Sequence, residues 1–291
     1  MLNISPTIKY LIAVIIYGTI GFFLHFVNAS SEFVVLCRGF IGSLFIGLVM
    51  LISNDKPDIN AIKKNLKMIV LSGVALGLNW VFLFAGYKYA VSIASLCNYT
   101  APIMVVVIST VIYKLNLSKG QALCVVGSFV GIILISGVFD SNYSIDIRAM
   151  IYGLLAAIGF VVLVLCNKKI KDIKPLDKTI TQLFVSAITV LPYVVINHGF
   201  PTSLDTRSLL VVLMLGVVHT GIAYIFYFNS IDVLEVNKVA ILGYIEPVLS
   251  ILTGALIFNE KLSLLGIIGA VLVLSSALMN ELLENKKVKH D

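Results

Sequence analysis

Charged side chains are scarce in this chain. Asp, Glu, Lys and Arg make up 12% of the 291 residues, whereas hydrophobic types make up 59%. A typical soluble domain has about twice that charged fraction, and it needs a polar surface that this composition does not provide. The sequence therefore argues against a soluble enzyme, a disordered chain and a nucleic-acid-binding domain. The formal net charge of +6 has another explanation, because the cytoplasmic loops of membrane proteins collect Lys and Arg.

Residues that bind metals or drive catalysis are also few. The four cysteines lie inside apolar runs, without CxxC spacing or a nearby His, which favours buried hydrophobic roles over disulfides or a zinc site. The four histidines are scattered, and neither HExxH nor GxSxG occurs, which disfavours a membrane enzyme. No GxxxxGK[ST] loop occurs, so ATP-driven transport by this chain alone is disfavoured. We expect no enzymatic activity, no cofactor and no metal.

Long apolar runs dominate what is present. A helix needs about 20 apolar residues to cross the hydrocarbon core of a bilayer, and short polar links separate ten runs of about that length. The runs are Ile8–Val27, Phe33–Ser53, Leu66–Tyr87, Ser92–Tyr113, Lys119–Val138, Ile147–Cys166, Asp177–Ile196, Arg207–Phe228, Val236–Ile257 and Leu262–Leu282. The sequence thus predicts an all-α integral membrane protein with ten transmembrane helices.

The basic residues predict the orientation of these helices. With the N-terminus inside, sixteen Lys and Arg residues fall on the inner side, four fall outside, and Arg38 lies within a span. Cytoplasmic loops are the positive ones. We therefore expect a multi-pass protein of the plasma membrane with both termini cytoplasmic, and residues 286–291 as a short basic cytoplasmic tail.

The number of spans also predicts two halves of opposite orientation. Five spans per half is an odd number, so residues 146–285 enter the membrane from the side opposite to residues 1–140. A shift of 145 positions places the Tyr99-x-x-Pro102 block on the Tyr244-x-x-Pro247 block. Such inverted five-helix repeats permit alternating access, in which a central site opens to each side in turn.

The two prolines of these blocks, Pro102 and Pro247, lie about ten residues into their spans. A proline within a helix removes a hydrogen bond and frees a carbonyl, which lipid tolerates only where protein or a cavity covers the backbone. Matched interruptions in two halves point to a substrate site at the repeat interface. A plain kink that aids helix packing is the alternative.

Several short blocks carry a family resemblance. They are Tyr17-Gly-Thr19, Arg38, Tyr99-Thr-Ala-Pro102, His219-Thr-Gly-Ile-Ala-Tyr224, Tyr244-Ile-Glu-Pro247 and Phe258-Asn-Glu260-Lys-Leu-Ser263. Over essentially the whole chain, the sequence resembles ten-helix members of the drug/metabolite transporter superfamily, of the EamA type. The resemblance implies transport of small solutes, commonly export of amino acids or other metabolites. One departure is Leu115, which stands where family members often carry a Glu matching Glu260.

Ionisable residues inside spans are costly and are functional candidates by default. Glu246 is the foremost, because it is central in its span and shares a polar helix face with Gly243, Ser250 and Thr253. A carboxyl group in an apolar environment takes up a proton more readily than one in water, so Glu246 is a candidate to bind and release protons. It is equally suited to hold a cationic or amino group, and a structural bond to a neighbouring helix is the alternative.

The other ionisable candidates are His219, near mid-span, and Arg38, in the outer third of its span. His219 is suited to relay protons, with a packing role as the alternative. Arg38 is permanently charged and needs an acceptor. A gate or helix-capping partner is the leading interpretation for Arg38, and direct binding of a carboxylate substrate is the alternative.

Polar and aromatic residues on neighbouring spans predict the lining of a ligand pocket, with ordinary interhelical packing as the alternative. These residues are Asn79, Trp80, Ser95, Asn98, Tyr99, Tyr224, Tyr227 and Tyr244. The Gly73-x-x-x-Gly77 and Gly127-x-x-x-Gly131 pairs predict close helix packing within the chain, or less favourably a dimer contact. Glu260 is expected to favour the N-terminus of the last helix.

These features together predict a secondary active or facilitative transporter of small metabolites such as amino acids, an exporter that works by alternating access. Its expected partners are a small-molecule substrate, the lipid bilayer and protons, without nucleic acid; monomer and homodimer both stay open. Channels, which need a continuous polar pore, and non-transporting membrane sensors are the alternatives.

Overall fold

The computed structural model describes residues 5–113, 118–135, 146–198, 200–201, 203–231, 233–234, 239, 242–261 and 263–288. The secondary structure of these residues is helical, with turns between the helices and no β-strand, which confirms the all-α class. Seven helical stretches are long and apolar enough to cross a membrane, and three apolar helices are shorter: Lys119–Ile135, Ile245–Ile257 and Leu264–Asn280. Each of these stretches overlaps one of the ten apolar runs.

The helices follow one another with short links. They are α1 (Pro6–Gly18), α2 (Ile20–Leu24), α3 (Ser31–Ile52), α4 (Ile59–Tyr87), α5 (Val91–Asn98), α6 (Ala101–Tyr113), α7 (Lys119–Ile135), α8 (Ile147–Asn167), α9 (Pro175–Tyr193), α10 (Thr206–Gly216), α11 (Ala223–Ile231), α13 (Ile245–Ile257) and α14 (Leu264–Val288). Two π-helical segments, η1 (Val194–His198) and η2 (Val217–Ile222), continue α9 and α10.

Polar residues in the links mark where apolar helices begin. Side-chain oxygens of Ser30, Asp58 and Asp146 accept hydrogen bonds from backbone N–H groups in the first turns of α3, α4 and α8, at 3.0–3.2 Å. A cap of this kind satisfies a donor that the helix itself cannot pair. Pro175 is the first residue of α9, a position at which its missing N–H costs nothing.

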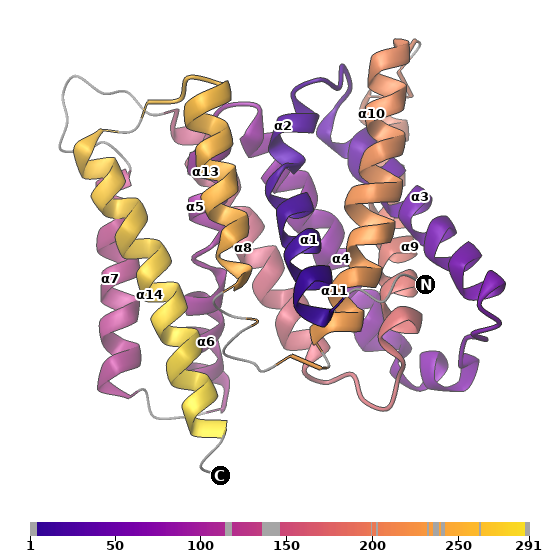
Figure 1. Ribbon diagram of the computed structural model, residues 1–291, viewed down its shortest axis with the longest axis horizontal. Helices are drawn as coiled ribbons and strands as arrows, with labels where there is room; N and C mark the ends of the chain where they lie inside the picture. Colours follow the sequence, from indigo (N-terminus) through magenta and orange to yellow (C-terminus); the bar gives the residue numbers. More distant parts are fainter. Residues whose placement is uncertain are drawn as a thin grey trace.

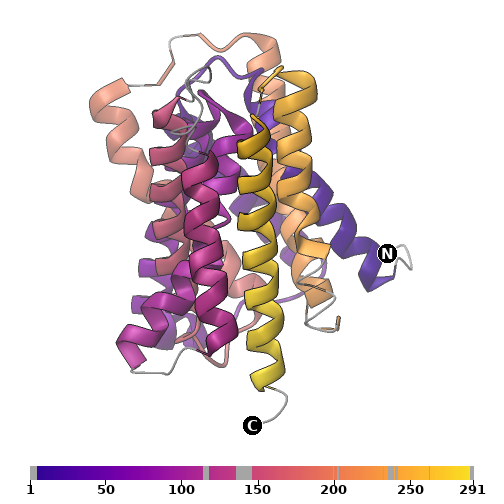
Figure 2. The same cartoon turned by 90° about the vertical axis from the view of Figure 1, so that its left-hand side faces the viewer.

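Helices that are far apart in sequence pack in pairs (Figure 1). The pair of α7 and α14 forms one end of the molecule, and α3 with α9 lies at the other. Figure 2 shows α7 and α14 side by side from that end. Between the two pairs stand α1, α4, α5, α8, α11 and α13. Most of the elements that carry the candidate residues therefore lie in the middle of the bundle, whereas Arg38 belongs to α3 of the end pair.

Glycines permit the closest of these contacts. A Cβ on Gly131 of α7 would lie 2.7 Å from the Gly269 carbonyl oxygen of α14, and one on Gly73 of α4 would lie 2.7 Å from the Val185 side chain of α9. Atoms cannot approach that closely, so both sites require glycine. The two glycine pairs expected from the sequence thus pack within the chain, as their spacing predicted.

The outer surface is apolar. Leu123 and Phe129 of α7 are 73% and 61% exposed, and Leu264 and Val271 of α14 are 75% and 61% exposed. A soluble protein does not leave such continuous apolar faces to water. This surface is suited to hydrocarbon, in agreement with a multi-pass membrane protein.

The chain interrupts its helices beside both prolines. Tyr99 and Thr100 form a turn between α5 and α6, and Tyr244 precedes α13. Pro102 and Pro247 are the second and third residues of the helices that follow. Each proline therefore stands in a first turn, where no intrahelical N–H bond is lost, rather than inside a continuous helix. The two π segments are a further departure from regular helix, and the sequence did not predict them.

Candidate functional site

Arg38 of α3 lies at the centre of the polar residues. Its side chain is 1% exposed, and its guanidinium stacks 4.2 Å from the centre of the Trp80 ring and 5.2 Å from that of Phe84. Its Nε donates to the Thr220 hydroxyl at 2.8 Å, and one terminal nitrogen donates to the His219 carbonyl at 3.3 Å. Among the described residues, no carboxylate lies within ion-pair distance of it, and its Nη1 has no hydrogen-bond partner.

The π segment η2 supplies both of these acceptors. The Thr220 hydroxyl donates to the Leu215 carbonyl, five residues back, at 2.9 Å, which is the spacing that a π turn brings into reach. The His219 ring is buried, approaches the Thr19 hydroxyl at 3.2 Å through Nε2, and meets the Phe23 ring edge-on. Its Nδ1 has no partner in the described structure. π turns of this kind often occur at functional sites.

Tyrosines surround the guanidinium. The Tyr224 ring stacks on Trp80 at 6.4 Å and lies 5.8 Å from the ring of Tyr17, which in turn lies 6.2 Å from Tyr227. The Tyr17 hydroxyl is buried and has no hydrogen-bond partner among the described residues. Of these tyrosines, the sequence analysis selected Tyr224 and Tyr227 but missed Tyr17, although it belongs to the Tyr17-Gly-Thr19 block.

Glu246 lies on the other side of these tyrosines, in the first turn of α13. Its carboxyl group lies near the Tyr99 hydroxyl, and Arg38 is close enough to act on its charge. The rings of Tyr99 and Tyr244, one at each chain interruption, pack 6.2 Å apart. The two interruptions thus contact each other, and Glu246 lies two residues after the second of them.

Asn79, Asn98 and Ser95 are bonded to other helices. The Asn79 side chain donates to the Asn98 side chain at 3.2 Å and to the Ala156 carbonyl of α8 at 2.8 Å. The Ser95 hydroxyl donates to that of Tyr87 at 3.1 Å. The structure therefore places these three residues among the central helices α4, α5 and α8, and it gives Asn79 and Ser95 packing partners.

A cavity of about 390 Å³ opens on one face of the bundle beside these residues. Its wall includes Val34, Phe84 and Tyr87, together with His25 and Glu260 nearer the mouth. Val34 lies one helical turn before Arg38, and Phe84 touches its guanidinium. The inner end of the cavity is therefore separated from Arg38 by a single aromatic layer.

Glu260 ties two parts of the chain together at the mouth of this cavity. Its carboxylate accepts from the backbone N–H groups of Val91 and Ser92, at 2.7 and 2.9 Å. Asn259 has a left-handed backbone with φ of 53°, which Asn tolerates. This turn directs Glu260 towards α5. Glu260 therefore caps α5, and the expectation that it serves the last helix is corrected.

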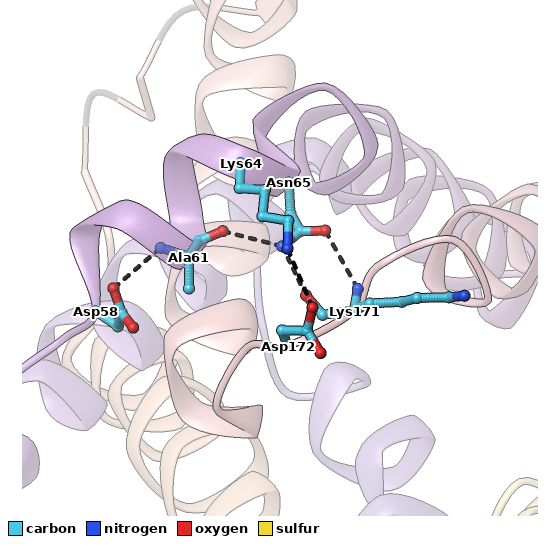
Figure 3. Close-up of polar contacts among 6 residues, drawn as sticks. All are labelled: Asp58, Ala61, Lys64, Asn65, Lys171 and Asp172. Carbon is cyan, nitrogen blue, oxygen red and sulfur yellow. Dashed lines mark hydrogen bonds and ion pairs between the residues drawn. The ribbon is translucent and has the colours of Figure 1, made fainter.

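The opposite face is held by a second set of polar bonds (Figure 3). The Asn65 amide donates to the Lys171 carbonyl at 2.9 Å and accepts from the Lys171 N–H at 3.2 Å, which joins α4 to the α8–α9 link. Lys64 pairs with Asp172 beside it. Buried Asp177 of α9 accepts from the Asp58 N–H at 2.9 Å. The α3–α4 and α8–α9 links are thus fastened to each other.

Comparisons with known proteins identify the family. The profile described as the EamA-like transporter family matches residues 6–137 and again residues 147–281. The chain belongs to the EamA-like transporter family. It is 27% identical over 272 residues to the "Uncharacterized transporter YxxF" of Bacillus subtilis (strain 168), with 92% of this chain and 87% of that protein covered. It is 25% identical over 240 residues to the "S-adenosylmethionine uptake transporter" of Rickettsia prowazekii (strain Madrid E), with 80% and 78% covered.

A solved crystal structure has the same fold as this EamA-like transporter. The TM-score is 0.64 at 17% identity, with 98% of this chain and 99% of the other covered. Together with the family match, these likenesses make the protein a multi-pass membrane transporter, and they indicate transport rather than enzymatic activity. Among the described residues, no three His, Cys, Asp or Glu side chains gather as a metal site would require.

Proposed function

We propose that this protein is a secondary transporter that exports small metabolites, such as amino acids or related solutes, across the plasma membrane by alternating access. It crosses the membrane ten times as two inverted halves, residues 1–140 and 146–285, with both termini and the tail of residues 286–291 in the cytoplasm. The observation that carries the proposal is the polar site at mid-bundle, where residues from both halves meet: Arg38 and Tyr99 from the first, His219 and Glu246 from the second.

The packing of the helices supports inverted repeats. If the two halves are exchanged, α3 takes the place of α9, and α7 takes the place of α14. The pair of α5 and α6 takes the place of α13. In each of these three sets, the corresponding helices contact each other. The contact of α4 with α8 likewise corresponds to that of α11 with α1. Such self-consistent pairing is expected of a pseudo-twofold axis, and the double match of one family profile agrees with it.

The two faces of the bundle differ in the way that alternating access requires. The cavity opens at the ends of α2, α4 and α5, whereas Asn65 and Asp177 fasten the links on the opposite face. With the termini inside, the cavity faces outward and the fastened face is cytoplasmic. Export then requires the cytoplasmic bonds to break so that substrate enters from within, while the outer cavity closes.

Glu246 is the proposed coupling group. It is the acid of the mid-bundle site, and it stands in the first turn of α13, next to the chain interruption at Tyr244. A carboxyl group there can carry a proton in one orientation and release it in the other, which couples substrate movement to the proton gradient. His219 is the proposed second proton carrier, because its Nδ1 has no protein partner. The proposed path between them passes Asn98 and Tyr244.

A transport assay in liposomes tests this proposal. The purified protein is reconstituted, and uptake and efflux of a metabolite panel are followed with and without an imposed pH gradient. We expect accumulation of at least one solute against its gradient when the pH gradient is imposed. Glu246→Gln should abolish this accumulation while leaving exchange of labelled for unlabelled solute. Failure of every solute to move in either direction refutes transport, and unitary currents in single-channel recording would indicate a channel.

A further inference from the structure

A buried carboxylate fastens the face of the bundle opposite the outer cavity. Asp177, in the first turn of α9, is fully buried and accepts from the backbone N–H of Asp58, the N-cap of α4, at 2.9 Å. Its other oxygen, Oδ1, has no partner among the described residues. A buried carboxylate with one oxygen unpaired is held less firmly than one with both oxygens paired. This bond is therefore suited to break and re-form, as a gate requires.

Residues about 145 positions apart hold equivalent places in the two proposed repeats. The rings of Tyr99 and Tyr244, which are 145 positions apart, pack at 6.2 Å, and those of Phe40 and Phe184, which are 144 apart, pack at 5.7 Å. A residue touches its own equivalent where a twofold axis passes between them. Contacts away from such an axis come in equivalent pairs, and in an inverted repeat the two members of a pair lie on opposite faces.

Glu32 is the equivalent of Asp177 on the outer face. It lies 145 positions earlier and stands in the first turn of α3, as Asp177 stands in the first turn of α9. The equivalent of Asp58 is Asp205, because the two residues are the N-caps of equivalent helices, α4 and α10. The bond between Asp177 and Asp58 thus has an equivalent on the outer face, between the Glu32 carboxylate and the Asp205 N–H.

This equivalent bond is not made in the present structure. Glu32 is half-buried, and within the part of the chain that the structure describes its carboxylate has no hydrogen bond or ion pair. The Asp205 N–H likewise has no partner there. The two segments are nevertheless adjacent, because the Asn28 N–H donates to the Ser208 hydroxyl of α10 at 2.9 Å. Acceptor and donor therefore belong to neighbouring segments but stay unbonded on the face where the cavity is open.

We propose that Glu32 is the gating residue of the outer face. When the outer cavity closes, Glu32 accepts from the Asp205 N–H, and on the other face Asp177 releases the Asp58 N–H. This inference rests on the proposed alternating access and names the residues that hold each state. The two bonds alternate, because inverted repeats exchange their conformations when the transporter reverses. Each joins one carboxylate to one backbone N–H, so the two latches contribute similar free energies, and neither state is trapped.

Disulfide cross-linking of the purified full-length protein tests the contact. The four native cysteines are replaced by serine, and Glu32→Cys with Asp205→Cys forms the outer pair. We expect this pair to cross-link about tenfold faster once Asp177→Ala removes the inner bond, and Asp177→Asn, the milder variant if Asp177→Ala does not fold, to give a smaller acceleration. The matched control is Asp172→Ala, which breaks only an exposed ion pair on the same face and should leave the rate within about threefold. Equal rates with and without the Asp177 substitutions overturn the proposal.

A reporter in the outer cavity separates gating from a structural role. Ala29→Cys places a single thiol in the cavity wall, and its rate of reaction with a maleimide measures how open the cavity is. Asp177→Ala should slow this reaction, and adding Glu32→Ala should restore the original rate, because neither face then has its latch. A structural Glu32 would not restore it, so a double variant as slow as Asp177→Ala alone overturns the proposal. The reaction needs no substrate, so that result leaves transport itself to be judged by the liposome assay.

Discussion

The bond between Glu260 and the start of α5 should contribute measurably to stability. The carboxylate accepts from two backbone N–H groups, at 2.7 and 2.9 Å, and no other acceptor is available to them within the first turn of a helix. Glu260→Ala removes both bonds, and Glu260→Gln keeps one neutral acceptor.

The size of the effect follows from the geometry. A hydrogen bond to a charged group contributes about 1.5–3 kcal/mol, and the lower value applies because Glu260 is half-buried at a cavity mouth. Two bonds give about 3 kcal/mol, and this figure includes the favourable position of a carboxylate at a helix N-terminus. We expect Glu260→Ala to lower the free energy of unfolding by about 3 kcal/mol and Glu260→Gln by about half of that. In a chain of this size, 3 kcal/mol corresponds to an apparent Tm decrease of about 5–10 °C.

Thermal unfolding of the purified protein in detergent measures this difference. The matched control is Asp205→Ala, because Asp205 also precedes a helix, α10, but its side chain makes no capping bond. That variant should change Tm by no more than about a third of the Glu260→Ala effect. Equal Tm values for Glu260→Ala and the control would refute the capping role. The Tm must also rise in the order Glu260→Ala, Glu260→Gln, wild type.

Three further predictions concern other contacts. Asn65→Leu removes the hydrogen-bond partner of the Lys171 N–H and C=O groups, whose bonds are part-buried, and we expect a loss of about 1–3 kcal/mol in thermal unfolding. Gly131→Ala would place a methyl group 2.7 Å from a backbone oxygen of α14, so we expect about 1–3 kcal/mol of destabilisation from the forced separation of α7 and α14. The hydrogen bond to Asp55 raises the pKa of the Lys174 ammonium group above its ordinary value of 10.5. A group whose pKa is raised on folding stabilises the fold at pH values below its ordinary pKa. The free energy of unfolding of Lys174→Gln should therefore fall below that of wild type by a constant amount from neutral pH to about pH 9. This difference should vanish at higher pH, because the wild-type lysine then loses its proton.

Each of these predictions has a control and a contradicting result. Lys64→Gln breaks an exposed ion pair near Asn65 and should cost less than about 1 kcal/mol; a loss equal to that of Asn65→Leu would contradict the prediction. Gly47→Ala meets only the end of the Ile180 side chain, at 3.3 Å, and should be neutral or slightly stabilising. An unchanged Tm for Gly131→Ala contradicts the close packing. A Lys174→Gln deficit that grows at high pH contradicts the ion pair.

The sequence predicted the helical class and the family from general features. Apolar runs of fixed length and short blocks such as Tyr244-x-x-Pro247 suffice for both, because burial in lipid constrains composition strongly. The π turn at His219 was not predictable, since a π segment differs from an α-helix by one residue in register and leaves the apolar pattern intact.

The sequence also did not predict which residues of one half contact which residues of the other. Nothing in the order of residues indicates that Glu260 bonds to Val91 rather than to the helix that follows it, since 169 positions separate the two. Tyr17 was missed for a related reason. Its hydroxyl matters only because Tyr224 and Trp80 place it beside Arg38, and that neighbourhood arises from three distant helices.

The π segment Val217–Ile222 has a consequence for how this region tolerates insertion and deletion. It holds one residue more than regular α geometry would need for the same rise. Deleting a single residue there would restore regular α geometry, so the helices on either side would keep their places while the residues of the segment itself would shift. Thr220 and the His219 carbonyl would then swing away from the Arg38 guanidinium. A shortened chain could keep its full complement of helical turns and still lose the partners of its one buried arginine.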